Sequence, residues 1–399
     1  MNYEPKKLSD FNPSLVTYSY SESGFKHNFS KEYQIILCDE ENSISIKNNI
    51  SLNYCIVYEC EVIWSNQNID SNLHRLGLDK NTISSDTNKY KTFYAIIFKI
   101  DNPSYVLTKN GTYHLKWKEN SFIKPILLRS NRIEEFYFIS TLLFGPEFII
   151  EFDNKSRLLP STTGDLVGAN GWESIDELFL VANICSNWVV LRNAEFLPDN
   201  FWENDKDIDV LCDNIELLSR VFNATKRANG ISCYKTKIQN KYVDIDMRFL
   251  GDDYYDSCWG KNMIETRVYR QNVPLLNNEN YFFSLFYHSK IHKKNIKPIY
   301  IKRLIDIARQ LGFDLTEKEI ANDTLSSEII DDYLYTKNYK FTYPYDISCY
   351  LNLNMNVIKR LNNIKTAHYT PYDKDVINLR ALIAIRKLKN ACRKLVRGL

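Results

Sequence analysis

The sequence predicts a mixed protein of the α+β or α/β class in three parts. Short runs rich in β-branched and aromatic residues dominate the first 150 residues, which indicates strands. Helix and strand patterns then alternate up to about residue 275, and amphipathic helical patterns fill the rest. We therefore expect an N-terminal α/β domain over 1–155, a central mixed sheet with helices over 165–275, and a helical C-terminal region over 276–399.

The N-terminal part is predicted to contain more strand than helix. The segments 53–64 (NYCIVYECEVIW) and 90–100 (YKTFYAIIFKI) are too short and too rich in β-branched residues for helices. Residues 130–145 predict a helix, with Ser130 or Asn131 as its cap and Gly145 at its end. The following PEFIIEF (146–152) predicts a return to strand. No motif here indicates a role for this domain.

A boundary is predicted at 154–171, where Gly, Pro, Ser and Thr are concentrated. After it the pattern predicts a helix over 172–187 and a buried strand over 188–193. Further elements follow in order: a strand over 207–212, a helix around 215–229, and strands over 231–238 and 241–250. Helical segments are expected over 279–293, 300–312, 325–336 and 373–399.

Composition limits the class of protein. Apolar residues make up 44% of the 399 residues and charged residues 25%, as in an ordinary globular protein. The net charge of +2 provides no overall attraction to nucleic acid or membranes. The nine cysteines form no C-x-x-C pair, which indicates reduced thiols rather than disulfides or a zinc module. Because no apolar run reaches the ~18 residues of a membrane span, we expect a soluble, cytoplasmic protein.

Two acidic strands carry the strongest functional signal. Asp207 and Asp209 alternate in one predicted strand, so both carboxylates share a face. The strand over 241–250 places Asp244, Asp246 and Arg248 on one face in the same way. Like charges held together repel, and a bound cation relieves that repulsion. Three carboxylates from two strands would suit Mg²⁺ or Mn²⁺ and phosphoryl transfer, whereas an exposed acidic strand without function is the alternative.

The order of these elements resembles the nucleotidyltransferase superfold of polymerase-β type over roughly residues 172–292. In that superfold a helix and a strand precede an Asp-x-Asp strand, and a later strand adds a third acid. The segment DMRFLGDDYYDSCW (246–259) is similar to uncharacterised bacterial and viral members found in surface-polysaccharide gene sets. The central sheet is therefore expected to be nucleotidyltransferase-like. One departure is that Arg192-Asn193 replaces the usual Gly-Ser or Gly-Gly turn.

The resemblance implies roles for particular residues. Asp207 and Asp209 would bind Mg²⁺ or Mn²⁺, and Asp246, favoured over Asp244, would complete the catalytic set as a metal ligand or base. Candidates for binding the phosphates of the donor are Arg192, Asn193, Lys206 and Arg248. The activity implied is transfer of a nucleotidyl or phospho group from a nucleotide-linked donor to a sugar, sugar phosphate or glycan, as in polysaccharide biosynthesis. A toxin-like transferase acting on a protein or tRNA, and a non-catalytic nucleotide- or glycan-binding relative, are alternatives.

Two other features allow weaker inferences. His288 and His292 lie four residues apart on a predicted helix, a spacing that suits a shared metal, although packing of an aromatic helix face is the preferred explanation. Contact with a phosphate or sugar beside the acidic strands is a further reading. The C-terminal helix is basic and amphipathic, which favours packing or docking on an anionic membrane surface. It lacks interleaved aromatics, so there is no strong nucleic-acid signal.

Overall fold

The computed structural model describes residues 31–79, 90–101, 105–107, 113–115, 126–149, 160–199, 201–204, 207–227, 231–293, 295–365, 367–368 and 373–397. It is a mixed α/β protein with two mixed sheets, of five and seven strands, and a largely helical C-terminal region. The chain divides into two compact units. The N-terminal unit comprises 1–186, 216–225 and 236–243, and the C-terminal unit comprises 187–215, 226–235 and 244–399. The acidic residues of the predicted site and the C-terminal helices fall in one unit.

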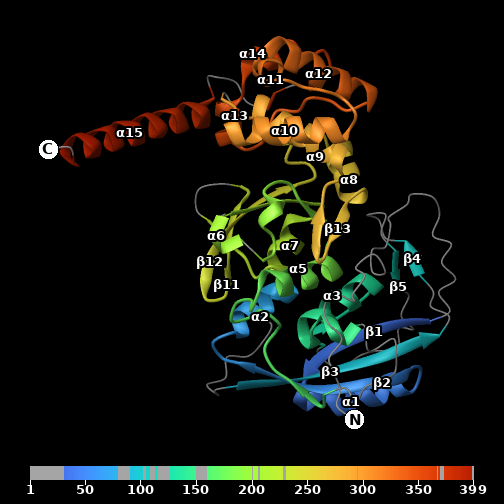
Figure 1. Ribbon diagram of the computed structural model, residues 1–399. Coiled ribbons are helices and arrows are strands. Elements are labelled where there is room, and N and C mark those ends of the chain that lie inside the picture. The colour runs from blue at the N-terminus through green and yellow to red at the C-terminus, as the bar shows by residue number, and fades with distance from the viewer. Residues whose placement is uncertain are drawn as a thin grey trace. The chain divides into compact units, whose positions relative to one another are not determined.

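The five-stranded sheet belongs to the N-terminal unit (Figure 1). Its strand order is β6 (Leu128–Arg129), β1 (Lys31–Asp39), β3 (Tyr90–Asp101), β2 (Cys55–Ser65) and β7 (Thr162–Thr163). Helix α1 (Glu40–Ser51) covers one face and α3 (Ile133–Phe144) the other. Alternate residues such as Ile36 and Phe98 pack against Ile46 and Ile50 of α1, as the period-2 pattern of a sheet requires. The predicted strands at 53–64 and 90–100 and the helix at 130–145 are confirmed.

Smaller elements complete the N-terminal unit. They are α2 (Ile69–Leu76), the hairpin strands β4 (Tyr105–Leu107) and β5 (Tyr113–Leu115), and α5 (Ile175–Cys185). The predicted strand at 146–152 is wrong over its described part, because residues 146–149 are helical. Phe148 lies with its ring centroid 4.4 Å from that of Phe144 and 5.6 Å from that of Tyr58. A short apolar run cannot be assigned by periodicity alone, and these aromatic contacts accompany the helical turn.

The seven-stranded sheet has the order β10 (Thr225–Lys226), β11 (Cys233–Ile238), β12 (Lys241–Phe249), β9 (Asp207–Cys212), β8 (Trp188–Val190), β14 (Val273–Leu275) and β13 (Val268–Arg270). Strand β9 runs parallel to β12 and antiparallel to β8. The predicted helix at 215–229 is shorter, since α7 (Ile215–Val221) ends before Asn223, which has a φ of 48°. That left-handed conformation stops a helix.

The rest of the C-terminal unit is helical. Its helices are α6 (Phe201–Asn204), α8 (Ser257–Glu265), α9 (Asn278–Lys290), α10 (Pro298–Gln310), α11 (Glu317–Ala321), α12 (Asp323–Thr336), α13 (Ile347–Asn352), α14 (Met355–Ile358) and α15 (Lys374–Arg397), together with the 3₁₀ turn η4 (Ala194–Phe196). Trp259, Phe286, Leu304 and Leu334 belong to one buried cluster that joins these helices to the sheet. The four long helices predicted after residue 276 are confirmed.

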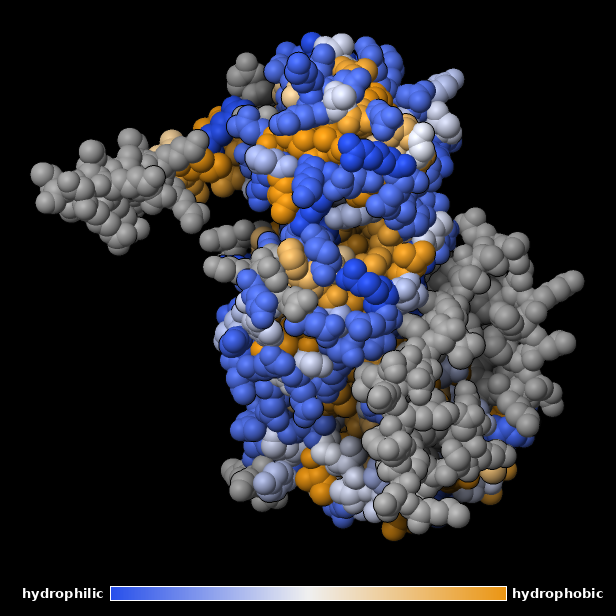
Figure 2. Space-filling view, in the orientation of Figure 1, coloured by the Kyte–Doolittle hydropathy of each residue, from blue (hydrophilic) through white to orange (hydrophobic). Residues whose placement is uncertain are grey.

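Helix α15 contacts α13, and Val376 is buried. Ile377, Leu382 and Ile385 are exposed, and Figure 2 shows this apolar surface on the described first half of the helix. Side chains from 386 onward lie outside the described residues, so docking of this helix on a membrane stays a prediction. Within the described part of the chain, no helix has both the length and the apolarity needed to span a bilayer.

Gly168 provides a test of packing in the N-terminal unit. It has a φ of +72°, and a Cβ placed there would lie 2.7 Å from the Trp172 ring. That ring cannot move easily, because Trp172 is buried and its indole N–H donates to the carbonyl of Phe222 at 2.9 Å. Gly168→Ala should lower the free energy of unfolding by about 2–4 kcal/mol, through backbone strain and overpacking together. Urea unfolding followed by tryptophan fluorescence measures it.

Gly251→Ala is the control, because Gly251 also has a positive φ but no atom lies within 4 Å of its added Cβ. It should cost only the backbone term of about 1 kcal/mol. Equal losses of unfolding free energy in the two variants would show that contact with Trp172 adds nothing to the cost of a side chain at residue 168.

Candidate functional site

The acidic residues of β9 and β12 lie side by side on one face of the sheet. In the parallel register Asp244 pairs with Asp207 and Asp246 pairs with Asp209. Partners in a parallel pair point to the same face, with strands about 4.8 Å apart. The four carboxylates therefore form two adjacent rows, as the alternation of acids in the sequence predicted. All four belong to the C-terminal unit.

Asp209 is held by a buried arginine. The guanidinium of Arg192 donates from Nη2 to Oδ1 at 2.6 Å and from Nε to Oδ2 at 3.2 Å. Only 5% of the Arg192 side chain and 11% of the Asp209 side chain are exposed. Burial raises the pKa of Asp209, Arg192 opposes that rise, and the neighbouring Asp246 adds to it. A paired charge in this geometry is the usual way to keep a buried carboxylate.

Asp246 is partly exposed and contacts a second arginine, Arg248. Its Oδ2 accepts from Nη2 of Arg248 at 3.2 Å, and 27% of its side chain is exposed. Its Oδ1 is buried and has no hydrogen-bond partner among the described residues. Arg248 also donates to Asp346 at 3.3 Å, and its guanidinium carbon lies 4.3 Å from the ring centroid of Tyr254. Arg248 thus positions Asp246 and links it to Asp346, the N-cap residue of α13, and its contact with phosphate stays a prediction.

The turn after β8 places Arg192 beside the acids. The Leu191 N–H donates to the carbonyl of Asp209 at 2.9 Å, which extends the pairing of β8 with β9 to the residue before Arg192. Asn193 then adopts the left-handed conformation, with φ 57° and ψ 25°. Glycine favours that region and asparagine tolerates it. Asn193 therefore supplies a backbone conformation typical of glycine at the place where Arg192-Asn193 stands instead of Gly-Ser or Gly-Gly.

Arg303 is a basic residue that the sequence analysis did not predict. Its Nη1 donates to the side-chain oxygen of Asn193 at 2.8 Å, and it forms an ion pair with Glu195. Its side chain is 15% exposed. The signal was weak, because Arg303 is one cation on an amphipathic helix, α10, far from any motif. The turn at 192–195 thus contains one arginine, Arg192, and is contacted by a second, Arg303, from α10.

The outer acids are more exposed. Asp244 accepts from Nη1 of Arg227 at 2.6 Å, with about half of each side chain exposed. Asp207, at the start of β9, is exposed. Lys206, the remaining candidate for phosphate binding, lies outside the described residues.

His288 of α9 and His292, which lies two residues beyond the end of that helix, are buried near Arg192 and Arg248. The helix predicted to carry both histidines therefore ends before His292. His288 Nδ1 lies 2.6 Å from the Tyr254 hydroxyl, and the His292 ring centroid lies 3.9 Å from that of Tyr254. Burial, followed by the positive charge of Arg192 and Arg248, lowers the pKa of both histidines well below its usual value. They are therefore neutral and take part in aromatic packing. Both nitrogens of His292 lack a hydrogen-bond partner among the described residues.

The donor set suits a divalent cation, with one obstacle. Asp207, Asp209 and Asp246 offer hard carboxylate oxygens on one face, and Oδ1 of Asp246 is an unpaired buried acceptor. However, both oxygens of Asp209 accept from Arg192. As the side chains lie, no three acidic, histidine or cysteine residues of the described chain are grouped closely enough to hold a metal ion. The positive charge of Arg192 beside Asp209 therefore opposes the binding of a cation there.

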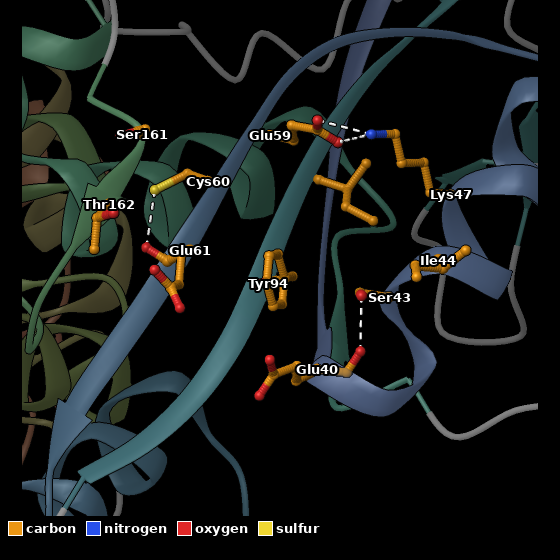
Figure 3. Close-up of a pocket in the computed structure, with 11 residues that line it drawn as sticks. Glu40, Ser43, Ile44, Lys47, Glu59, Cys60, Glu61, Tyr94, Ser161 and Thr162 are labelled. Carbon is orange, nitrogen blue, oxygen red and sulfur yellow. Dashed lines mark hydrogen bonds and ion pairs between the residues drawn. The ribbon is translucent and has the colours of Figure 1, made fainter.

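A separate groove lies in the N-terminal unit, with a volume of about 630 Å³ (Figure 3). Residues of α1, β2, β3 and β7 line it, and Tyr94 lies among the carboxylates of Glu40, Glu59 and Glu61. Desolvation and these carboxylates raise the pKa of Tyr94. The one lysine of the lining, Lys47, is paired with Glu59. Because the lining offers no unpaired cation for a phosphate, we do not place a nucleotide site here.

Comparison of the chain with protein-family models, with curated proteins and with solved structures finds no match.

The pair of Arg192 and Asp209 predicts a large effect on stability. Arg192→Met should lower the free energy of unfolding by about 3–5 kcal/mol, because it leaves the Asp209 carboxylate buried without a counterion. Arg227→Met removes the same charge from an exposed pair and should cost less than about 1 kcal/mol. Urea unfolding of both variants measures the difference. Equal costs would mean that the Arg192 pair behaves as an exposed one.

Asp252 predicts a pH effect. It is 2% exposed, it accepts from the Tyr254 N–H at 2.9 Å, and burial, only partly opposed by Arg248, raises its pKa to about 6. The unfolded value is about 3.9, so the folded state binds the proton more tightly between these values. This residue's contribution to stability therefore falls as pH rises from about 4 to 6, by up to about 3 kcal/mol.

Asp252→Asn should remove that dependence, so that the variant gains stability relative to the wild type as pH rises through this window. Urea unfolding at pH 4.5 and 7.5 measures the gain. Parallel pH profiles for the two proteins would show that Asp252 titrates normally.

Proposed function

We propose that the protein is a metal-dependent nucleotidyl- or phosphotransferase whose site is the acidic face of β9 and β12. The observation that carries the proposal is the parallel register that pairs Asp209 with Asp246. Carboxylates at this spacing from separate strands bind hard divalent cations well. Arginines Arg192 and Arg303 lie near the turn that follows β8, and guanidinium groups suit phosphate oxygens.

Asp207, Asp209 and Asp246 would hold Mg²⁺ or Mn²⁺, which when bound neutralises charge on the phosphoryl oxygens. The protein's own groups would do the rest. Asp246, with its unpaired Oδ1, would orient the attacking hydroxyl of the acceptor or accept its proton. Arg248 would fix the position of Asp246 through their 3.2 Å contact. Neutral, buried His288 and His292 would hold Tyr254 against Arg248 rather than bind metal.

Arg192, Asn193 and Arg303 are the groups proposed to bind the donor. The guanidinium of Arg192 can present a planar pair of N–H groups to two phosphate oxygens. Asn193 shapes the turn and is itself held by Arg303. A nucleotide or nucleotide-linked donor fits this arrangement, because its phosphates need cations on one side and a metal on the other. The acceptor proposed, a sugar, sugar phosphate or glycan, follows from the sequence resemblance alone.

A second candidate is a non-catalytic module that binds a nucleotide or glycan. The contact of Arg192 with both oxygens of Asp209 favours it, because an arginine in this place neutralises the carboxylate without a metal. In such a protein the acids would serve structure, and Mg²⁺ would not alter the binding of nucleotides. Calorimetric titration with nucleoside triphosphates and CDP-linked donors, with and without Mg²⁺, separates the two candidates.

Substitution of single acids tests the transferase directly. Asp209→Asn and Asp246→Asn should each reduce Mg²⁺-dependent transfer or hydrolysis by at least ~2 orders of magnitude, as loss of a metal ligand does. Asp244→Asn is the matched control on the same face, and because Asp244 pairs with exposed Arg227 it should change the rate only a few-fold. The assay compares product release over a panel of nucleoside triphosphates, CDP-linked donors and sugar phosphates.

The reverse order, with Asp244→Asn inactive and Asp246→Asn active, would contradict the assignment of the third acid. Absence of any Mg²⁺-dependent binding or turnover across the panel would leave the non-catalytic module as the better description.

A further inference from the structure

Arg192 supplies the positive charge that a bound metal ion would otherwise supply beside Asp209. Asp209 and Asp246 are neighbours in register, so their like charges repel across one pair of strands. The positive charge that offsets this repulsion comes from the chain itself, because both oxygens of Asp209 accept from the guanidinium. The Arg192 side chain is 5% exposed, which keeps the contact away from solvent. Because the guanidinium places its positive charge against both oxygens of Asp209, a metal is disfavoured there while this contact is closed.

We infer that Arg192 is an internal counterion that keeps Asp209 from binding metal until the phosphate of a donor draws the guanidinium away. The inference rests on the proposed function and adds a mode of regulation to it. Metal and donor would then bind interdependently, since each favours the arrangement in which Arg192 has left Asp209. A site without this contact would bind its metal whether or not a donor is present.

Arg192 has an N–H group with no acceptor, and such an exchange needs one. Its Nη1 is buried and has no hydrogen-bond partner among the described residues. An incoming phosphate oxygen could take this N–H first, before the other two donors leave Asp209, so the guanidinium need never be unpaired. The neighbouring Asn193 has a left-handed backbone conformation, which turns the chain directly after Arg192. Because Nη1 is buried, a phosphate oxygen reaches this N–H only when the groups around it move, and it then finds a donor with no other partner.

The metal side has a corresponding free group. Oδ1 of Asp246 is buried and has no partner among the described residues. Once Arg192 moves, Asp209 regains two free oxygens beside it on the adjacent strand. Of these two unpaired protein atoms, the donor would bind the phosphate and the acceptor would bind the metal. The two bindings are linked, and by thermodynamic necessity each changes the affinity of the other by the same factor.

Binding of Mn²⁺ to the wild-type protein tests the coupling. Electron paramagnetic resonance of free Mn²⁺ gives the affinity, with and without saturating AMP, CMP, GMP or UMP, which chelate Mn²⁺ only weakly. We expect at least one monophosphate to tighten Mn²⁺ binding about tenfold, within the usual range of coupling between sites. Equal Mn²⁺ affinity with and without each monophosphate, in a protein that does bind both, would overturn the inference.

Arg192→Met tests whether Arg192 causes the coupling between metal binding and nucleotide binding. This variant should bind Mn²⁺ about tenfold more tightly than the wild type in the absence of nucleotide, and addition of the monophosphate should then change the affinity less than twofold. Arg227→Met removes a positive charge beside Asp244 and should leave both the affinity and the coupling of the wild type. If Arg192→Met keeps the full coupling, the inference is wrong. Circular dichroism establishes that the variant is folded, and if it is not, the wild-type titration decides.

Failure of the inference and failure of the proposed function give different results. Transfer activity with Mn²⁺ affinity independent of nucleotide would contradict the role of Arg192 and leave the transferase intact. Absence of Mn²⁺ binding to the wild type under every condition, together with absence of transfer, would contradict both.

Discussion

The ion pair of Arg192 and Asp209 is the interaction on which the site depends. Strands β9 and β12 pair in parallel, and this register brings two carboxylates together in a place largely shielded from water. Such an arrangement is unfavourable unless a positive charge stands beside it. The arginine that follows β8 supplies that charge through two hydrogen bonds. The contact of Arg192 with Asp209 therefore affects both the stability of the C-terminal unit and the charge of its carboxylate site.

A second arginine extends this coupling to the helices. Arg248 contacts Asp246 and Asp346 and lies over Tyr254, whose ring packs against His292. Residues from β12, α9 and the start of α13 thus converge on one buried network. Buried charges are stable only when their remaining hydrogen-bond capacity is also used. Arg192, Asp246, Arg248 and His292 of this network each have buried atoms without a hydrogen-bond partner among the described residues.

Much of the framework could be predicted from sequence. The alternation of Asp207 with Asp209 and of Asp244 with Asp246 fixed which carboxylates share a face, because a strand has a period of two. Their neighbouring rows followed from the order of elements. The partner of Asp209 was not predictable in this way, since Arg192 was interpreted as a phosphate contact and pairing depends on a side-chain conformation. Arg303 carried no motif, and the helical turn at 146–149 lies in an apolar run whose period fits helix and strand alike.

The central claim is that Asp209 and Asp246 form a cation site in which Arg192 stands in for the metal. The most direct measurement is a crystal structure of the protein with Mn²⁺ and a nucleotide, using the anomalous scattering of Mn²⁺ to locate the ion. The account predicts an anomalous peak in contact with Asp209 and Asp246, with the Arg192 guanidinium moved onto a phosphate. A nucleotide bound while Arg192 still contacts both oxygens of Asp209, with Mn²⁺ elsewhere or absent, would contradict it.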